Sequence, residues 1–187
     1  KLKNPKVVYE KYPHQLSGGQ QQRIMIAIAI ACNPKLLIAD EPTTSLDGLV
    51  KNEIISLIKS LQLEYKMSVI FISHDLALVR KLADKIIIIK EGSIVEEGSA
   101  NNLFEKAKAP YTKALLDSAP SFRKDLPPKS PLAALDGTIP TLQHLPIGCR
   151  LGPRCPRAQK ECVKTPELRH VQDHFYSCHF PLIRDKQ

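Results

Sequence analysis

The chain has 187 residues, of which 43% are hydrophobic and 25% charged, a composition typical of globular proteins rather than disordered ones. This length fits one domain of ordinary size with a small additional module, and it excludes a large multidomain protein. The net charge of +8 is compatible with binding to nucleic acid, anionic lipid or an acidic partner protein. No apolar run approaches the roughly 20 residues of a membrane-spanning helix. No apolar segment follows the basic N-terminal residues, so no secretory signal is expected.

A glycine-containing motif, Leu16-Ser17-Gly18-Gly19-Gln20, precedes an apolar segment that predicts a helix over residues 21–31, ended by Pro34. Glycines let a backbone approach an anion, and a helix N-terminus presents free amides and the positive end of its dipole. The motif therefore predicts a phosphate-binding position. A serine N-cap followed by loop glycines is the alternative, and the pattern alone leaves both open.

Three short aliphatic runs, residues 36–39, 69–72 and 86–89, read as strands of a parallel sheet buried on both faces. Between the first two runs, Leu49–Lys66 carries apolar residues at helical spacing, which are Ile54, Leu57, Ile58 and Leu61. A shorter stripe at residues 76–82 repeats the alternation. Strand, helix, strand predicts a βαβ unit and the α/β fold class.

The chain after residue 90 turns back on itself in the predicted structure. Glu91-Gly92 marks a turn, and Ile94-Val95 is expected to close a hairpin. Pro110 then fits the first turn of a helix that continues to Ser118.

Polar side chains follow two of the predicted strands directly. Asp40 and Glu41 come after the first strand, and His74 comes after the second. Open α/β sheets bind ligands at the carboxyl ends of their strands, so His74 is expected on the same edge as Glu41. There Asp40 suits the Mg²⁺ of a nucleotide, Glu41 an attacking water, and His74 a γ-phosphate. An acidic loop and a structural histidine are the alternatives.

These motifs resemble the ATP-binding-cassette (ABC) ATPases. Residues 16–20 resemble the signature motif, residues 36–41 the Walker B strand with its catalytic glutamate, residues 45–47 (Ser-Leu-Asp) the D-loop, and His74 the switch histidine. The resemblance implies ATP and Mg²⁺ as cofactors. It makes Glu41 and His74 catalytic and assigns nucleotide contacts to Ser17, Gly18, Gly19, Gln20, Asp40 and Asp47. It also implies that the signature serves a nucleotide held by a second, facing cassette.

One motif of this family has no counterpart in the chain. No G-x-x-x-x-G-K-[ST] occurs, so the phosphate cradle and its lysine are missing. The abrupt start at Lys1 leads us to expect that the corresponding upstream part has been removed. Residues 1–98 are accordingly predicted to be the C-terminal portion of a P-loop NTPase core, truncated at its N-terminus.

Residues 99–187 are predicted to form a proline-rich, cysteine-containing C-terminal extension, since 10 of the 15 prolines lie beyond residue 119. Residues 109–116, 148–150 and 153–156 resemble the extension of oligopeptide and dipeptide importer ATPases. That resemblance implies a second ATPase subunit, two membrane permeases and a peptide-binding protein. It places the chain peripherally, at the cytoplasmic face of the cell (inner) membrane.

Cys149, Cys155, Cys162 and Cys178 lie within about 30 residues, a density that suggests a metal site when thiols stay reduced. The spacing lacks the C-x2–4-C pairs that zinc usually takes. It therefore favours a [4Fe–4S] cluster, with zinc, two disulfides and unligated thiols as alternatives. The charge of such a cluster would be compensated by three arginines, Arg150, Arg154 and Arg157. A zinc site could also use His179, which is otherwise expected to be exposed, while Cys32 is expected to be a small buried hydrophobe.

The resemblance predicts a subunit that couples ATP hydrolysis to peptide uptake. A soluble ABC-type ATPase acting on nucleic acid is one alternative, although the tail has few aromatic residues and no basic stripe, so no nucleic-acid partner is expected. A half-site donor without catalysis of its own is another. The sequence does not choose among peptide lengths, nickel and antibiotic peptides as cargo.

Overall fold

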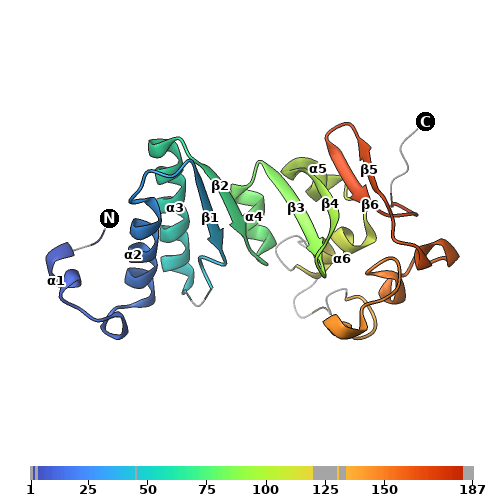
Figure 1. Ribbon diagram of the computed structural model, residues 1–187, viewed down its shortest axis with the longest axis horizontal. Coiled ribbons are helices and arrows are strands. Elements are labelled where there is room, and N and C mark those ends of the chain that lie inside the picture. Colours follow the sequence, from blue (N-terminus) through green and yellow to red (C-terminus); the bar gives the residue numbers. More distant parts are fainter. Residues whose placement is uncertain (1, 3, 45, 120–129, 131–133, 183–187) are drawn as a thin grey trace. The chain divides into compact units, whose positions relative to one another are not determined.

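The computed structural model describes residues 2, 4–44, 46–119, 130 and 134–182 (Figure 1). Ser45, the first residue of the predicted D-loop, and Lys1 lie outside the described residues. The chain divides into two compact units, Lys1–His74 and Asp75–Gln187. The predicted division after residue 98 stays a prediction about domain organisation.

The first unit contains two strands and three α-helices among its described residues. In chain order these elements are α1 (Pro5–Tyr9), the 3-10 helix η1 (Pro13–Gln15), α2 (Gly18–Ile30), β1 (Leu36–Asp40), α3 (Gly48–Tyr65) and β2 (Ser68–Ile72). The predicted helices and strands of this part are confirmed to within a few residues at their ends.

The two strands β1 and β2 pair in parallel, with Ile38 opposite Ile70, and α3 connects them as a βαβ unit. Both α2 and α3 lie on one side of this sheet (Figure 1). Their apolar stripes and one face of the sheet form a core of Ile26, Leu37, Ile54, Ile58, Leu61 and Met67. The i, i+3, i+4, i+7 spacing of the sequence therefore correctly identified the buried face of α3.

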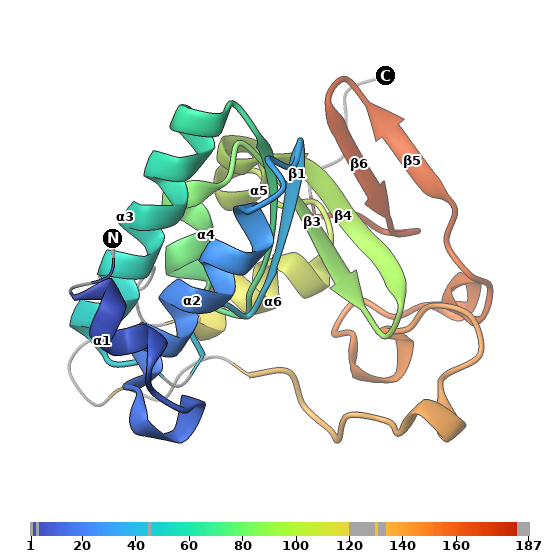
Figure 2. The same cartoon turned by 60° about the vertical axis from the view of Figure 1, so that its left-hand side comes forward.

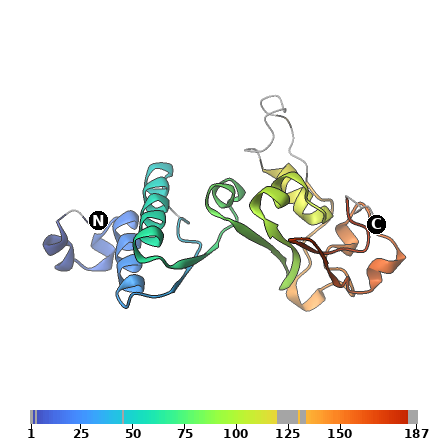
Figure 3. The same cartoon turned by 90° about the horizontal axis from the view of Figure 1, so that it is seen from above.

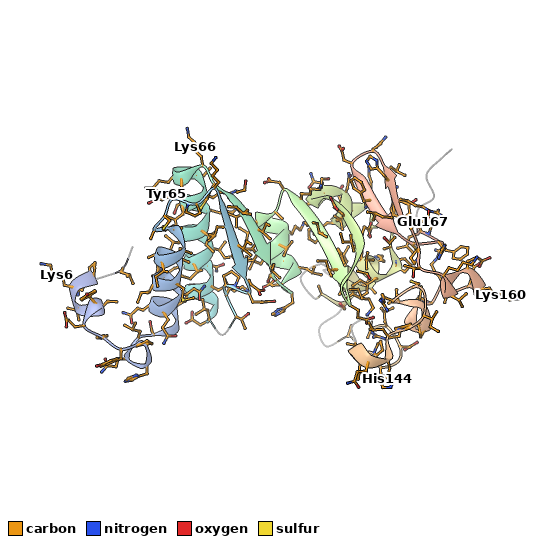
Figure 4. The ribbon with its side chains drawn as sticks, in the orientation of Figure 1. Lys6, Tyr65, Lys66, His144, Lys160 and Glu167 are labelled. Atoms are coloured by element: carbon orange, nitrogen blue, oxygen red, sulfur yellow. The ribbon has the colours of Figure 1, made fainter. Side chains whose placement is uncertain are left out.

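Helices α2 and α3 run side by side in the views of Figures 1 and 3. Helix α3 ends at Lys66, whose φ of 51° is left-handed and whose N–H bonds the Gln62 carbonyl. Tyr65 and Lys66 extend outward from this end of the helix (Figure 4). The turn at Lys66 then delivers the chain to β2.

The opposite face of the β1–β2 sheet is exposed, which corrects the prediction of strands buried on both faces. Its aliphatic side chains are 46–62% exposed, and they are Leu36, Ile38, Ile70 and Ile72. The unalternating hydrophobicity of these runs indicated cover on both faces, but the described residues of the first unit cover only the side of α2 and α3.

The second unit contains four strands, three α-helices and three 3-10 helices among its described residues. In chain order they are α4 (Leu76–Leu82), β3 (Lys85–Lys90), β4 (Ser93–Ser99), α5 (Ala100–Glu105), α6 (Pro110–Ser118), η3 (Leu142–His144), η4 (Gly152–Arg154), η5 (Lys160–Val163), β5 (Leu168–Val171) and β6 (His174–Ser177). Its strands form one antiparallel sheet in the order β3-β4-β6-β5. Figure 2 shows the β5–β6 hairpin beside β3 and β4. The helix predicted to start at Pro110 is confirmed.

Strand β3 contains the run 86–89 that the sequence placed in the parallel sheet, and that assignment is wrong. Glu91 and Gly92 both adopt positive φ, 48° and 76°, a pair of conformations that suits a tight two-residue hairpin turn. The turn folds β4 directly back onto β3 in antiparallel pairing. The predicted hairpin is confirmed, and among the described residues β3 pairs with β4 alone.

A buried acid joins the parts of the second unit. Glu96 on β4 is fully buried and accepts the backbone N–H groups of Lys108 and Ala109, at 2.6 Å and 2.9 Å. His174 on β6 contacts the same carboxylate, with its Nε2 2.6 Å from Oε1. Because a buried carboxylate requires such partners, Glu96 fixes the start of α6 and the β5–β6 hairpin to β4.

Within the described residues, no helix is both long and apolar enough to cross a bilayer.

Candidate functional site

The carboxyl ends of β1 and β2 bring Glu41 and His74 into direct contact. Nδ1 of His74 lies 2.6 Å from Oε1 of Glu41, and the His74 backbone N–H donates to the same oxygen at 3.1 Å. Parallel pairing aligns Asp40 with Ile72, so the residues that follow emerge at one edge. The predicted proximity of positions 41 and 74 is confirmed, while their catalytic roles stay predictions.

The position of Glu41 depends on a tight turn after β1. Glu41 adopts a φ of 45°, an uncommon conformation for a residue with a side chain. Its N–H bonds the Ile72 carbonyl at 3.0 Å, and its own carbonyl accepts the Thr44 N–H at 3.2 Å. These bonds hold the turn in place and direct the carboxylate toward His74.

Hydrogen bonds lower the pKa of Glu41. His74 is the largest cause, and Thr44 is the next, since its hydroxyl donates to Oε2 at 2.8 Å. Glu41 is therefore an ionised carboxylate at neutral pH, with one oxygen facing His74 and the other Thr44. The His74 side chain is 80% exposed, so a ligand can reach its other ring nitrogen. The sequence analysis missed Thr44; its hydroxyl three residues after an acid in a turn was the available signal.

Asp40 ends β1 and lies on the exposed face of the sheet, because it alternates with the buried Leu37 and Ala39. Its carboxylate is thus open to solvent at the edge that carries Glu41. A carboxylate in this position can bind Mg²⁺ directly or through water.

The signature segment forms a helix N-terminus, as the sequence predicted. Ser17 is the N-cap of α2: its Oγ accepts the Gln20 N–H at 3.4 Å, and the Gln20 side chain accepts the Ser17 N–H at 3.0 Å. In this capping box, Ser17 and Gln20 of the motif stabilise the start of the helix. Gly18 and Gly19 contribute the first N–H groups of the helix, which no carbonyl within the helix can accept.

Packing supplies a second reason for the two glycines. A Cβ at Gly18 would lie 3.3 Å from Leu46, and a Cβ at Gly19 would lie 2.6 Å from Val50. The signature therefore packs directly against the loop before α3 and the first turn of α3. The glycine motif predicted the approach of a phosphate, whereas this contact with α3 depends on the tertiary fold.

Asp47, predicted to contact nucleotide, caps α3 instead in this structure. Its Oδ1 accepts the N–H groups of Leu49 and Val50, at 3.1 Å and 3.0 Å. An aspartate at an N-cap satisfies two free amides and favours the helix dipole. The same residue thus positions Val50 against Gly19, and its nucleotide contact stays a prediction.

The four cysteines of the C-terminal region line one cavity of about 90 Å³. Gly148, with a φ of 81°, shapes its wall, because a Cβ there would collide with the Val163 backbone. The Cys149 N–H then donates to the Cys162 carbonyl at 2.9 Å. Burial raises the pKa of Cys178 to about 11 and also raises that of Cys155. Cys155 and Cys178, which are both half-buried, are therefore neutral thiols at neutral pH.

The arginines that were predicted to compensate the charge of a cluster do not all lie at the cavity. Arg150 and Arg157 line the cavity, whereas Arg154 donates to the carbonyls of Asp136 and Leu135. His179 is half-buried and contacts the Lys164 carbonyl at 3.0 Å, so the expectation of an exposed imidazole is wrong. The expectation for Cys32 is also wrong: it is exposed, since it follows the end of α2 in a turn.

Two protein-family models match the chain. Residues 1–44 match the ABC transporter family, and residues 95–162 match the family described as oligopeptide/dipeptide transporter, C-terminal region.

Curated relatives match nearly the whole chain. A dipeptide transport ATP-binding protein of Haemophilus influenzae is 49% identical over 182 residues, which are 97% of this chain and 54% of that protein. A peptide transport system ATP-binding protein of Escherichia coli is 44% identical over 186 residues, covering 100% of this chain and 56% of its own length. An oligopeptide transport ATP-binding protein of Bacillus subtilis is 44% identical over 155 residues, 83% of this chain and 46% of that protein. The chain thus spans about half the length of these relatives.

Among solved structures, an ATP-binding cassette dimer bound to ADP and Pi is 41% identical, with a TM-score of 0.43 over 47% of this chain and 38% of that chain. A second, cbiO1 from Clostridium perfringens, described as part of the ABC transporter complex cbiONQ, is 37% identical with a TM-score of 0.46 over 50% of this chain and 38% of that chain.

The predicted [4Fe–4S] cluster is not supported and is corrected here. The curated relatives are named as peptide-transport ATP-binding proteins with no reference to such a cluster. In the described part of the chain, no three His, Cys, Asp or Glu side chains are grouped so as to hold a metal ion. The same geometry gives no support to the zinc alternative.

The family matches, the relatives and the motif geometry all indicate an ATP-binding protein of peptide transport. The ABC transporter match covers the signature and the β1 edge, and the importer match covers the C-terminal region that carries the cysteine cavity. On this basis, the chain belongs to the family of ATP-binding subunits of oligopeptide and dipeptide ABC importers and corresponds to the C-terminal portion of these proteins.

Proposed function

We propose that this chain supplies the hydrolytic and signature residues of an ATPase that drives peptide import. The observation that carries the proposal is the Glu41–His74 contact of 2.6 Å at the carboxyl ends of two parallel strands. Its support from relatives is that three of them, at 44–49% identity, are named for dipeptide, peptide or oligopeptide transport.

In the proposed reaction, Glu41 accepts a proton from the water that attacks the γ-phosphate. Its lowered pKa keeps it ionised and able to orient that water. A His74 protonated on both ring nitrogens would donate one hydrogen bond from Nδ1 to Glu41 and one from Nε2 to a γ-phosphate oxygen. Asp40 would hold Mg²⁺, whose charge neutralises the phosphates of ATP.

The phosphate cradle of the nucleotide would come from outside these residues, because the chain contains no G-x-x-x-x-G-K-[ST] segment. A sharp test therefore joins the N-terminal portion of the Haemophilus influenzae relative, up to the start of the match, to this chain as one fusion protein. Glu41→Gln in that fusion is expected to lower single-turnover ATP hydrolysis by at least 100-fold while ATP binding is retained.

Glu64→Gln is the matched control, since Glu64 is exposed on α3 and loses the same charge. Hydrolysis in the Glu41→Gln fusion at the rate of the Glu64→Gln fusion would refute the assignment of Glu41.

Ser17, Gly18 and Gly19 are proposed to contact a nucleotide held by a facing second ATPase subunit. The free N–H groups of the first turn of α2 support this role. In a pair of the fusion protein with an intact relative, Ser17→Arg is expected to slow hydrolysis at the relative's nucleotide. Ser60→Arg, on the solvent side of α3, is the control. If it slowed hydrolysis as much as Ser17→Arg, the proposed contact of the signature with the relative's nucleotide would be contradicted.

The remaining partners follow from the family. We propose two membrane permeases, reached from the cytoplasmic face of the membrane, and a peptide-binding protein that delivers cargo to them. Co-purification of the fusion protein with permeases from a detergent-solubilised membrane fraction tests this placement. Exclusive recovery of the fusion from the soluble fraction, with the permeases co-expressed, would count against it.

A further inference from the structure

A side chain near the start of α2 reaches back to the segment that precedes the signature. Nε2 of Gln21 donates to the Pro13 carbonyl at 2.6 Å and to the Leu16 carbonyl at 3.4 Å. Side chains on a helix lean toward its N-terminus, so this residue is well placed to contact the chain that enters the helix. Gln21 therefore connects α2 to η1 and to the first residue of the signature, Leu16.

The segment that Gln21 holds lies largely on the surface. Pro13, His14 and Gln15 are exposed and Leu16 is half-buried, so side-chain burial does little to fix this part of the chain. The Pro13 carbonyl also accepts the Leu16 N–H, at 3.1 Å. Because a carbonyl oxygen has two lone pairs, this one atom can link the turn before the signature to the helix after it.

The glycines of the signature lie between two attachment points. Gly18 and Gly19 present the N–H groups that are proposed to contact a nucleotide, and they pack against Leu46 and Val50. Gln21 supplies the second attachment, through η1. Hydrogen-bond donors stabilise a developing charge most effectively when they are held in place before the ligand arrives.

We propose that Gln21 is a positioning residue of the signature. It fixes η1 and the start of α2, so that the N–H groups of Gly18 and Gly19 are held ready for a phosphate on a facing subunit. Both N–H bonds of its amide are directed to carbonyls of this chain, and its Oε1 is an acceptor, so Gln21 has no donor left for the phosphate itself. This inference rests on the proposed function of the signature.

The neighbouring Gln22 provides a matched control. It lies one residue further along α2, about 100° around the helix from Gln21, and among the described residues its side chain makes no hydrogen bond. Replacing either glutamine by methionine keeps a similar side-chain length and helix propensity while it removes the amide.

The first measurement needs no nucleotide. Solvent-exchange NMR on the isolated chain compares the backbone N–H groups of Gln15 and Leu16, which close η1 on itself. Gln21→Met is expected to speed exchange at these two groups about fivefold, the factor that one neutral hydrogen bond typically supplies. Gln22→Met is expected to leave the exchange rates unchanged. Unchanged exchange in Gln21→Met would overturn the proposal.

The second measurement is ATP hydrolysis by the fusion protein paired with an intact relative. The fusion also carries Glu41→Gln, so that hydrolysis reports the nucleotide held by the relative. Gln21→Met is expected to lower kcat about tenfold and to leave the KM for ATP within about twofold, because the relative's own phosphate cradle holds that nucleotide. Gln21→Lys keeps a donor and is expected to restore at least half of the lost rate, with Gln22→Lys as the control for the added charge.

A hydrogen bond that only stabilised the fold would give a different pattern. Equal slowing by Gln21→Met and Gln22→Met would overturn the positioning role. A raised KM for ATP at unchanged kcat, or a lysine variant as slow as the methionine variant, would overturn it as well.

Failure of the positioning role is distinguishable from failure of the proposed function through Ser17→Arg in the same pair. Normal kcat in Gln21→Met where Ser17→Arg slows hydrolysis would overturn the positioning role and leave the proposed function standing. Normal kcat in both variants would refute the proposed function of the signature, and this inference with it.

Discussion

Gly19→Ala is expected to destabilise the chain through a steric collision with α3. The new Cβ would lie 2.6 Å from Cγ1 of Val50, whereas ordinary contact begins near 3.4 Å. Relieving that overlap requires a shift of about 0.8 Å within packed surroundings, and such overpacking costs about 1–3 kcal/mol. The greater helix propensity of alanine offsets about 0.5–1 kcal/mol of this cost. The expected net loss is therefore up to about 2.5 kcal/mol in the free energy of unfolding.

Urea denaturation measures this loss as a lower midpoint with an unchanged slope. In thermal unfolding, each kcal/mol corresponds to a fall of about 2–4 °C for a chain of this size. Gly48→Ala is the control within the same unit, because a Cβ there would meet nothing within 4 Å. Gly48 is the first residue of α3. The substitution Gly48→Ala is expected to leave the free energy of unfolding unchanged or to raise it by up to about 1 kcal/mol.

The double substitution tests the named collision. Val50→Ala removes the methyl group that the new Cβ would strike, so Gly19→Ala is expected to cost at least ~1 kcal/mol less in the Val50→Ala background. A cost that is the same in both backgrounds, or a Gly19→Ala chain as stable as Gly48→Ala, would refute the packing argument. The glycine would then be required only for approach of a ligand.

Three further predictions concern the two units separately. Thr44→Val removes a bond that lowers the pKa of Glu41; NMR titration should show that pKa rising toward 4.5. The ionised Glu41 contributes to the free energy of unfolding above pH 4.5, and this contribution is lost as the pH falls through its lowered pKa. If Thr44→Val left the free energy of unfolding unchanged throughout the acidic range, the prediction would be contradicted. Glu96→Ala should cost about 3–5 kcal/mol and lower hydrogen-exchange protection in β6, where unaltered protection would exclude Glu96 as the anchor. At pH 9, alkylation of Cys178 should be roughly 50-fold slower in the native chain than in denaturant, because its pKa is about 11 rather than 9.0; equal rates would disprove the buried thiol.

Local patterns predicted much of this protein correctly because their causes are local. The stripe of Ile54, Ile58 and Leu61 specifies which side of α3 is buried. Pro110 and Ser17 mark helix starts through effects that act within one turn of backbone. Proximity of Glu41 and His74 also followed from sequence, because parallel strands align their carboxyl ends at one edge.

Three assignments made from the sequence are wrong. The run 86–89 has the composition of a central parallel strand, but the positive φ values of Glu91 and Gly92 turn it into an antiparallel hairpin. Four clustered cysteines predicted a metal cluster, yet among the described residues no three His, Cys, Asp or Glu side chains are grouped so as to hold a metal ion. The apolar runs in β1 and β2 predicted that both faces of the sheet are buried. Apolar composition shows that a strand is suited to burial, but it does not show which residues pack against it.

By itself, the sequence determined α2, α3, α4 and α6, the strands β1 to β4, the family motifs and the edge at which the acid and the histidine meet. Tertiary structure decided what each motif residue touches: Gly19 faces Val50, Asp47 caps α3, and Thr44 shares Glu41 with His74. The reason is physical. Propensity and periodicity act between neighbours in sequence, whereas steric fit, burial and hydrogen-bond partners depend on residues that only folding brings together.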